Sequence, residues 1–429
     1  MKKHLLCVLL PWVILSTGYC QKTDSVFILQ PDRVFDGENM HTGWHVVVQG
    51  NHILAAGESA SAPADLPVRT IRLNGATLLP GFIEGHSHLL LHPYSETPWD
   101  EQVMNESEAE RVARAVVHAR KTLLAGFTTV RDLGTEGAGY ADVGLKAAIE
   151  KGVIPGPRMI IATRAIVATG SYGPKTRNLT NTMNRGAAEA DGVDALIKEV
   201  RTQIGNGADL VKVYADYRWG PDKNISQPTF TLEELKTVVE VAASSGRKVV
   251  AHASTTEGMR RATLAGISCI EHGDNGTDEI FELMIKNKTA YCPTLSAAEA
   301  TAKNNDGWRK GIDPDTKRIA IKRKSFALAL QKGVTICFGG DVGVYAHGDN
   351  AREMEAMVEY GMKPIEVLRS ATSVNADVFG YREKIGRIRK GLYADLVAVY
   401  GDPSVNISDV RKTALVMKDG IIYINPIQH

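Results

Sequence analysis

The feature that most constrains the fold is a repeated alternation of short apolar segments with longer amphipathic ones through the middle of the chain. Segments such as 106–126 and 231–246 carry apolar residues at the three- and four-residue spacing of a helix. Eight short strand-like segments occur between the helical ones, at 78–88, 127–134, 158–166, 209–216, 248–254, 268–273, 290–296 and 335–341. Strand–helix alternation repeated eight times predicts an α/β fold of the (β/α)₈ TIM-barrel type, with an open doubly wound sheet as the alternative.

Local signals mark the ends of several expected helices. Thr231 with Glu234, and Ser254 with Glu257, have the spacing of a capping box at a helix start. Glycines stand where the preceding helices should end, at Gly126, Gly246, Gly266 and Gly333.

The two ends of the chain differ from the middle. From Ser25 to Leu79, alternating apolar residues are interrupted by Asp-Gly, Gly-Asn and Asn-Gly turns, which predicts β-hairpins. Segments 394–402 and 412–424 repeat this style. We therefore expect one small β-sandwich domain built from residues 21–79 and 384–429, around a barrel at 80–383.

The first twenty residues have the layout of a cleavable signal peptide. Lys2 and Lys3 precede an apolar run from Leu5 to Leu15, which is too short to span a bilayer comfortably. Cleavage after Gly18 or Cys20 would satisfy the preference for small residues. Tyr19 stands where a lipoprotein site requires a small residue, so export to the periplasm or the medium is expected over lipid anchoring.

Charge and cysteine content exclude some classes of protein. The net charge of the 429 residues is +1, which gives no reason to expect nucleic acid or an anionic surface as partner. Cysteine occurs only at Cys7, Cys20, Cys269, Cys292 and Cys337, without a CxxC pair. The last three lie far apart in apolar strand-like segments, so buried free thiols are expected instead of a disulfide framework.

Polar residues follow several of the expected strands at the end where barrel enzymes carry their active sites. These residues are His86, His88, Lys212, His252, His272 and Asp341. Each has an ordinary structural reading, such as a hydrogen-bonded core histidine, a paired lysine or a turn aspartate. Together they come from five strands to one face, with side chains that suit a divalent metal. The combination predicts a metal centre.

Within these segments the sequence resembles a known family. "LLPGFIEGHSHL", "AGFTTVRDLG", "VAHAS", "IEHG" and "GGDVGVYAHGDNAREMEAMVEYGM" are similar to motifs of the amidohydrolase superfamily, in its prolidase-like and imidazolonepropionase-like branch. The resemblance extends over nearly the whole chain after the signal segment. It implies a binuclear metallohydrolase, with two divalent ions, most often zinc, and commonly a homo-oligomeric assembly.

The resemblance also implies roles for the six residues. His86 and His88 would hold the more buried metal, and His252 and His272 the second. Lys212 would be carboxylated on its amine and bridge both metals, because a buried lysine has a depressed pKa and a neutral amine adds carbon dioxide. Asp341 would bind the first metal and act as general acid–base while hydroxide attacks an amide carbonyl.

The resemblance is less specific for the substrate. Dipeptides or N-acyl amino acids are expected, and some relatives hydrolyse ochratoxin A, an N-acyl phenylalanine. Ser171-Tyr172 replaces the Gly-Gly-His-Gly context usual in the family. Candidate substrate contacts are Tyr172, Tyr214 and His347, with Arg218 and Lys175 as further candidates for a carboxylate. A hydrolase of cyclic amides of the imidazolone type, or a non-catalytic binding barrel, are the alternatives.

Overall fold

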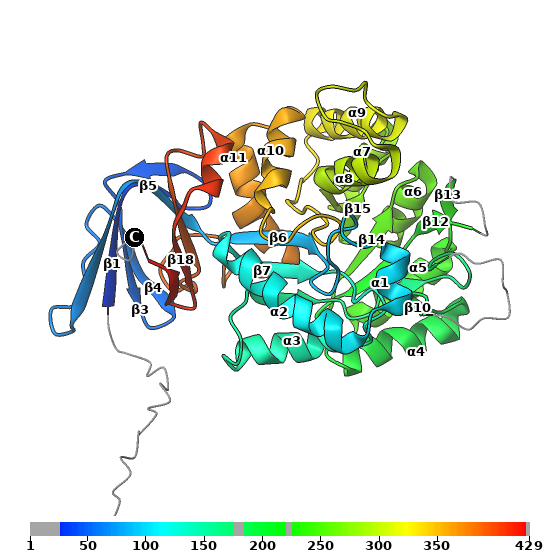
Figure 1. Cartoon of the computed structure of the whole chain (residues 1–429), viewed down its shortest axis with the longest axis horizontal. Helices are drawn as coiled ribbons and strands as arrows, with labels where there is room; N and C mark the ends of the chain where they lie inside the picture. The colour runs from blue at the N-terminus through cyan, green and yellow to red at the C-terminus, as the bar shows by residue number, and fades with distance from the viewer. Residues whose placement is uncertain (1–25, 175–183, 220–224, 426–429) are drawn as a thin grey trace, which may run out of the picture.

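The computed structural model describes residues 26–174, 184–219 and 225–425, so the expected signal segment 1–20 and Lys175 lie outside the described residues. Figure 1 shows a β sheet at one end of the molecule and, beside it, a larger unit in which helices surround strands such as β6, β7, β14 and β15. The fold is therefore mixed α/β, with a separate β-rich part, as the sequence predicted.

The β-rich part is one sheet that contains strands from both ends of the chain. Its order is β19-β18-β17-β5-β1-β3-β4, with β2 paired to β1. The N-terminal strands are β1 (Val26–Phe35), β2 (Met40–Thr42), β3 (His45–Gln49), β4 (His52–Gly57) and β5 (Val68–Pro80). The C-terminal strands are β17 (Leu396–Tyr400), β18 (Thr413–Lys418) and β19 (Ile421–Ile424).

Strand β5 joins the strands from the two chain ends into one sheet. Its 13 residues pair in parallel with β1 and, at their C-terminal end, antiparallel with β17. Apolar side chains from both parts, among them Leu29, Val48, Leu78 and Leu415, form one buried cluster. The strands from both chain ends thus share one hydrogen-bonded sheet and one buried cluster.

Tight turns join the hairpins of this sheet. Gly50 (φ 59°) and Asn51 connect the antiparallel strands β3 and β4. Asp419 and Gly420, with φ values of 50° and 74°, connect β18 and β19. Two consecutive positive φ angles match the twist of a two-residue hairpin, which explains the Asp-Gly sequence.

The larger unit contains two sets of parallel strands. One set is β6-β7-β8, and the other is β10-β9-β11-β14-β15-β16. The bounds are β6 (Phe82–Ser87), β7 (Phe127–Asp132), β8 (Arg158–Ile161), β9 (Ile166–Val167), β10 (Ala188–Glu189), β11 (Val211–Tyr214), β14 (Val249–Ala253), β15 (Cys269–His272) and β16 (Ala290–Cys292). A short hairpin, β12 (Asp216–Arg218) with β13 (Ser226–Pro228), follows β11. Each of the first seven predicted segments contains a strand.

Backbone hydrogen bonds link the two sets directly at one place and through the segment 335–341 at another. Asp209 N–H donates to the carbonyl of Ile161 at 2.8 Å, and on the opposite side Gly85 N–H donates to that of Phe338 at 3.2 Å. The eighth predicted segment forms only isolated parallel bridges, at and just beyond it, instead of a regular strand. Its backbone is crowded, because a Cβ on Gly339 would lie 2.6 Å from Cys292 Sγ.

The helices largely follow the predicted pattern. They are α1 (Trp99–Asn105), α2 (Glu108–Leu124), α3 (Ala141–Glu150), α4 (Gly192–Gly205), α5 (Leu232–Ala243), α6 (Thr256–Ala265), α7 (Asp278–Asn287), α8 (Leu295–Asp306), α9 (Lys317–Lys332), α10 (Ala351–Glu359), α11 (Pro364–Arg369) and α12 (Asn375–Phe379), with the π-helical turn η1 (Ser370–Val374) and the 3₁₀ turn η2 (Ile407–Arg411). Among the described residues, no helix is both long and apolar enough to cross a lipid bilayer.

Helix ends confirm most of the expected caps. Thr231 and Glu234 form a capping box, and Gly266 and Gly333 end α6 and α9 in the left-handed conformation. The predicted cap Ser254 is wrong by one residue, since Thr255 caps α6. The N–H groups of both residues donate to the carboxylate of Asp216, which holds Ser254 outside the helix.

Candidate metal centre

Five of the six predicted metal-site residues stand at or beyond the carboxyl ends of parallel strands, and the sixth, Lys212, lies inside its strand. The six are His86 on β6, His88 just after it, Lys212 on β11, His252 on β14, His272 at the end of β15, and Asp341 in the loop that pairs with the end of β6. Since these ends meet at one face of the unit, side chains that are far apart in the sequence come together.

Alternation along β11 explains the burial of Lys212. Val211 and Val213 pack in the apolar layer shared with the helices, so Lys212 between them faces the other side of the strand. The side chain is 0% exposed, and its Nζ has no hydrogen-bond partner among the described residues. Burial lowers the pKa of Lys212 below its ordinary value. A buried amine without a partner is costly, which marks this position as one that needs a ligand or a modification.

Asp341 lies beside both histidines of the first strand. Its Oδ1 is 3.3 Å from His88 Nε2 and 3.6 Å from His86 Nε2. One ligand atom each from His86, His272 and Asp341 lie within 4.8 Å of one another. His86 Nε2 is buried and has no hydrogen-bond partner in the part of the chain that the structure describes. Imidazole nitrogens and a carboxylate oxygen at such separations fit a divalent cation such as Zn²⁺.

His252 and His272 form the other side of the centre. Their ring centroids are 4.4 Å apart, and that of His272 is 5.0 Å from that of His86. His272 Nδ1 is hydrogen-bonded to Thr294 Oγ1 at 2.8 Å. Burial, and then the charge of Lys212, hold the pKa of His252 well below its ordinary value. Both histidines are thus favoured in the neutral form that binds metal ions.

Two of these residues adopt a backbone conformation that is rare outside glycine. The φ angle is 61° at Asp341 and 76° at His272. Alternation on β15 would place His272 on the same side as Ile270, which packs in the apolar layer under the helices. The left-handed turn at His272 redirects its side chain to the centre instead. Such local strain is concentrated at functional sites.

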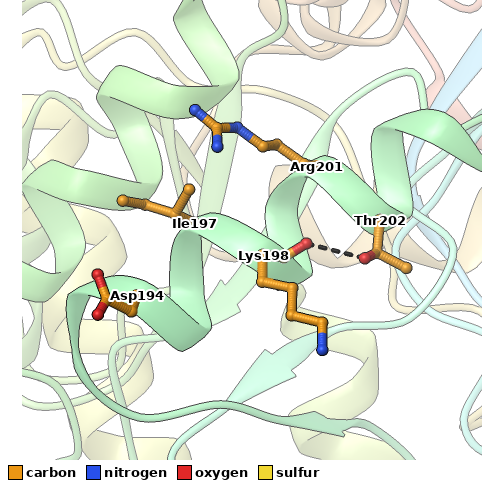
Figure 2. Close-up of a pocket in the computed structure, with 5 residues that line it drawn as sticks. All are labelled: Asp194, Ile197, Lys198, Arg201 and Thr202. Carbon is orange, nitrogen blue, oxygen red and sulfur yellow. Dashed lines mark hydrogen bonds between the residues drawn. The ribbon is translucent and has the colours of Figure 1, made fainter.

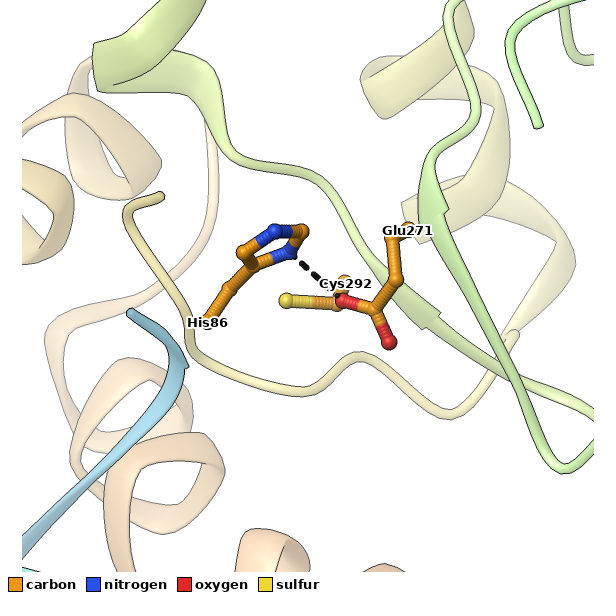
Figure 3. A group of neighbouring side chains, drawn as sticks. All are labelled: His86, Glu271 and Cys292. Atoms are coloured by element: carbon orange, nitrogen blue, oxygen red, sulfur yellow. Dashed lines mark hydrogen bonds and ion pairs between the residues drawn. The ribbon is translucent and has the colours of Figure 1, made fainter. Parts of the chain in front are cut away.

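A buried ion pair that the sequence analysis missed supports His86. Glu271 Oε2 is 2.9 Å from His86 Nδ1, and Glu271 Oε1 accepts a 2.7 Å hydrogen bond from Arg131, which also donates to the carbonyl of Gly85. Figure 3 shows the carboxylate of Glu271 and the thiol of Cys292 beside the ring of His86. Because the carboxylate accepts at Nδ1, the ring keeps its proton there and leaves Nε2 free for a metal ion.

The sequence carried a signal for this pair. Arg131 and Glu271 each stand inside an apolar strand-like segment, where a charged side chain needs a partner. Their opposite charges indicate a pair, but they are 140 residues apart, and only the fold brings β7 and β15 to the same interior.

Four aromatic residues, called here the aromatic wall, lie beside His252. The three tyrosines, Tyr172, Tyr214 and Tyr217, are in mutual contact, and Trp99 packs against Tyr172. The ring centroid of Tyr172 lies 5.2 Å from that of Trp99, 4.6 Å from that of Tyr214 and 4.8 Å from that of Tyr217. Tyr214 stacks on His252 at 4.6 Å. Two of the predicted substrate contacts, Tyr172 and Tyr214, thus stand next to the metal centre.

The remaining predicted contacts are placed differently. His347 is buried, with Nε2 2.9 Å from the carbonyl oxygen of Leu91, and its ring stacks on His118 at 4.3 Å. These contacts show that His347 packs against the loop that follows His88. Arg218 donates to the hydroxyl of Tyr217 at 2.8 Å, at the edge of the aromatic wall.

An open hollow of about 580 Å³ lies elsewhere on the surface, on one face of helix α4 (Figure 2). It is lined by Asp194, Ile197, Lys198, Arg201 and Thr202. None of the six metal-site residues lines it, and its side chains do not form a set of metal ligands. The chemistry therefore points to the strand ends and not to this hollow.

The amidohydrolase family profile matches residues 77–422, which is most of the chain. An ochratoxinase from Aspergillus niger is 30% identical over 393 residues, covering 85% of this chain and 80% of that protein. The crystal structure of a Xaa-Pro dipeptidase with bound methionine superposes with a TM-score of 0.81 at 30% identity, covering 93% of this chain and all of that one. An imidazolonepropionase from Streptomyces coelicolor is 22% identical, covering 85% of this chain and 87% of that protein.

The chain therefore belongs to the amidohydrolase family. It is a hydrolase that acts on carbon–nitrogen bonds, with prolidase-like and ochratoxinase relatives. Its fold matches amidohydrolase structures, and the family generally uses a binuclear divalent metal centre. The cluster of histidines, lysine and aspartate described above contains candidate residues for such a centre.

Proposed function

We propose that this protein is a binuclear metallohydrolase that cleaves the amide bond of a dipeptide or an N-acyl amino acid. The observation that carries the proposal is the convergence of six potential ligands around Lys212 Nζ and His86 Nε2, two buried nitrogen atoms that have no hydrogen-bond partner among the described residues. Relatives that act on such substrates, the Xaa-Pro dipeptidase and the ochratoxinase, support the choice of bond.

The residues fit a pair of divalent cations, for which we propose Zn²⁺. His86, His88 and Asp341 would hold one ion, and His252 and His272 the other. Lys212 would be carboxylated on Nζ, which turns a buried amine into an anion shared between two cations. When bound, the ions lower the pKa of water and polarise a carbonyl group. The burial and lowered pKa of Lys212 support the neutral amine that carboxylation requires.

Asp341 would transfer the proton. Burial by itself raises the pKa of its carboxyl, but His86 and His88 outweigh burial and hold that pKa below its ordinary value. Asp341 is therefore ionised before reaction and can accept a proton from the attacking water on Oδ1. It would then return this proton to the leaving nitrogen, as a general acid.

The aromatic wall would receive the side chain of the substrate. Tyr172 and Tyr214 are both buried, and Tyr214 stacks directly on His252. Ochratoxin A, whose amide joins an aromatic acyl group to phenylalanine, belongs to the substrate class proposed here. A cyclic amide of the imidazolone type is the second candidate, supported by the match to an imidazolonepropionase.

We further propose that the two parallel sets close into a (β/α)₈ barrel at 80–383, with the remaining strands as a composite domain of 21–79 and 384–429. The bonds between Asp209 and Ile161 and between Gly85 and Phe338 support closure. The basic and apolar layout of residues 1–20 supports export to the periplasm or the medium. A homo-oligomeric state is proposed from family habit alone.

The decisive experiment combines metal analysis with a substrate panel. Purified protein should contain about two divalent ions per chain and should release amino acid from one or more dipeptides or N-acyl amino acids, including ochratoxin A. Fewer than about one ion per chain, with no hydrolysis after zinc or manganese is added, would contradict the proposal. Exclusive hydrolysis of a cyclic amide would favour the second candidate.

A further inference from the structure

We propose that Glu136 binds the protonated amino group of the substrate, so that the enzyme prefers dipeptides with a free amino terminus to N-acyl amino acids. The inference deepens the function proposed above and rests on it. It assigns a substrate class on the basis of one buried carboxylate.

Glu136 has one satisfied and one unsatisfied oxygen. Its Oε2 accepts hydrogen bonds from the hydroxyl of Tyr172 at 2.6 Å and from Trp99 Nε1 at 3.0 Å. Its Oε1 is buried and has no hydrogen-bond partner among the described residues. Since the residue is only 2% exposed, an unpaired acceptor on a charged group is costly unless a ligand supplies the donor.

Among the residues that the structure describes, no lysine or arginine side chain forms an ion pair with this carboxylate. The guanidinium of the nearby Arg111 donates instead to the backbone carbonyls of Leu90, Thr135 and Glu136. Within the described ranges, the one ion-pair contact of the carboxylate is His88 Nδ1 at 3.9 Å. That nitrogen is hydrogen-bonded to the carbonyl of Gly134 at 2.9 Å, so its proton is already engaged. A cation from outside is the partner that fits.

The position of Glu136 relates it to the reacting bond. His88 stands between Glu136 and Asp341, with Nδ1 facing the former at 3.9 Å and Nε2 facing the latter at 3.3 Å. The carboxylate of Glu136 and that of Asp341, the proposed proton acceptor, are thus separated by the imidazole ring of His88. In a dipeptide the α-amino nitrogen lies two bonds from the carbonyl carbon that is attacked, so it can reach Glu136 from the metal centre.

Glu136 also adjoins the aromatic wall. The hydroxyl of Tyr172, which donates to Glu136, lies 3.4 Å from that of Tyr214, and Tyr214 stacks on His252. An aminoacyl group bound in this corner would have its side chain against the wall and its ammonium on the carboxylate. An N-acyl amino acid has no charged group to place there.

The backbone around Glu136 is arranged to hold it in this place. Its own φ is 49°, in the left-handed region. A Cβ on Gly134 would lie 3.2 Å from Glu136 Oε1, so any other residue at 134 would crowd the free oxygen. Such strain is maintained where a side chain has a function.

The test compares a dipeptide with its N-acetyl derivative and its des-amino analogue, using the metal-loaded enzyme and the variants E136Q, E136D and E101Q. Wild type is expected to show a kcat/KM for the dipeptide about 10- to 100-fold above that for the other two, the range of one charge-assisted hydrogen bond. E136Q should remove this preference, mainly by raising KM for the dipeptide, with unchanged metal content. E136D, which keeps the charge, should retain part of it. E101Q removes an exposed carboxylate on α1 and should behave as wild type.

Equal or better hydrolysis of the N-acetyl substrate by wild type would overturn the inference. So would an E136Q variant that loses activity equally on all three substrates, since that result indicates a structural support for Tyr172 and Trp99. Hydrolysis of the N-acetyl substrate alone leaves the proposed amidohydrolase function standing while this inference fails. A fully metal-loaded wild type that cleaves none of the three rejects the proposed function and the inference together.

Discussion

The metal centre and the aromatic wall are neighbours, but they are built in different ways. Most residues of the candidate centre stand at or near the ends of regular strands, and His86 is held by the buried pair of Glu271 and Arg131. Three of the four wall residues, Trp99, Tyr172 and Tyr217, lie outside the long parallel strands, and hydrogen bonds and ring contacts hold them. The comparison suggests that the rigid strand ends determine the reaction, whereas the loops determine which acyl group is accepted.

The largest effect is expected at the centre itself. Asp341→Asn keeps the size of the side chain but removes its ability to take up a proton from water. We expect kcat to fall by about 10³-fold or more, with metal content near that of wild type, because general acid–base catalysis contributes up to about 10⁴-fold. Steady-state kinetics with parallel metal analysis measures both. Retained turnover would remove Asp341 from its proposed role.

Loss of the buried Glu271–Arg131 pair behind the centre should lower the stability of the folded protein. Glu271→Ala leaves Arg131 as an unpaired buried charge, which is expected to lower the free energy of unfolding by about 3–5 kcal/mol. Affinity for the metal should also fall by about 10- to 100-fold, since His86 loses the acceptor at Nδ1. Urea unfolding and chelator competition measure the two effects. Glu271→Gln, which is almost isosteric, is the control for lost volume, and unchanged metal affinity in both variants would contradict the support role.

Asp142 is a buried carboxyl outside both the centre and the aromatic wall, and its effect on the free energy of unfolding is expected to be smaller and to depend on pH. Burial, and then the charge of Asp132, raise the pKa of Asp142 to about 7. In the unfolded chain this carboxyl ionises near its ordinary value of 3.8, so its contribution to stability is present at low pH and is lost as the pH rises from about 4 to 7.

Asp142→Asn removes this titration and keeps an acceptor for the N–H of Thr163. The variant should therefore gain stability relative to wild type between pH 4 and pH 7, by up to about 4 kcal/mol. Urea unfolding at the two pH values measures this difference, and Asp194→Asn on the exposed face of α4 serves as the control. A difference that does not change with pH would show that Asp142 is ionised in the folded protein.

The smallest effect on kinetics is expected from a substitution in the aromatic wall. Tyr172→Phe removes one hydroxyl from Glu136 but keeps the ring. We expect KM to rise by about ten- to a hundredfold for substrates with a large acyl group, with a smaller change in kcat, because a hydrogen bond to a charged group contributes about 1.5–3 kcal/mol. A fall in kcat as large as that of Asp341→Asn would remove the distinction between wall and centre.

The sequence predicted the metal centre more fully than its surroundings because alternation along a strand is a strictly local rule. Lys212 faces inward since its neighbours Val211 and Val213 face the helices. His272 reaches the centre through a left-handed turn that breaks the alternation, which residue patterns alone do not reveal. The Glu271–Arg131 pair needed knowledge of which strands adjoin in the interior.

Predictions outside the strands depended on contacts that no local pattern encodes. Tyr172 and Tyr214 stand beside His252, but the buried acceptor Glu136 next to them was not anticipated. The motif around His347 marks a packing position behind His88, where its ring stacks on His118. The pairing of one long strand, β5, with strands from both chain ends was likewise not encoded in any local pattern.

The pairing of strand β5 affects how the chain folds while it is being synthesised on the ribosome. The partner of its last residues, β17, begins at Leu396, more than 300 positions later in synthesis. Until β17 emerges, the edge of β5 around Leu78 and Leu79 has no neighbour on that side, although these side chains are fully buried in the finished protein. The nascent chain therefore has an unpaired, aggregation-prone strand edge for most of its synthesis, and a truncation that removes the residues from Leu396 onward would make that edge permanent.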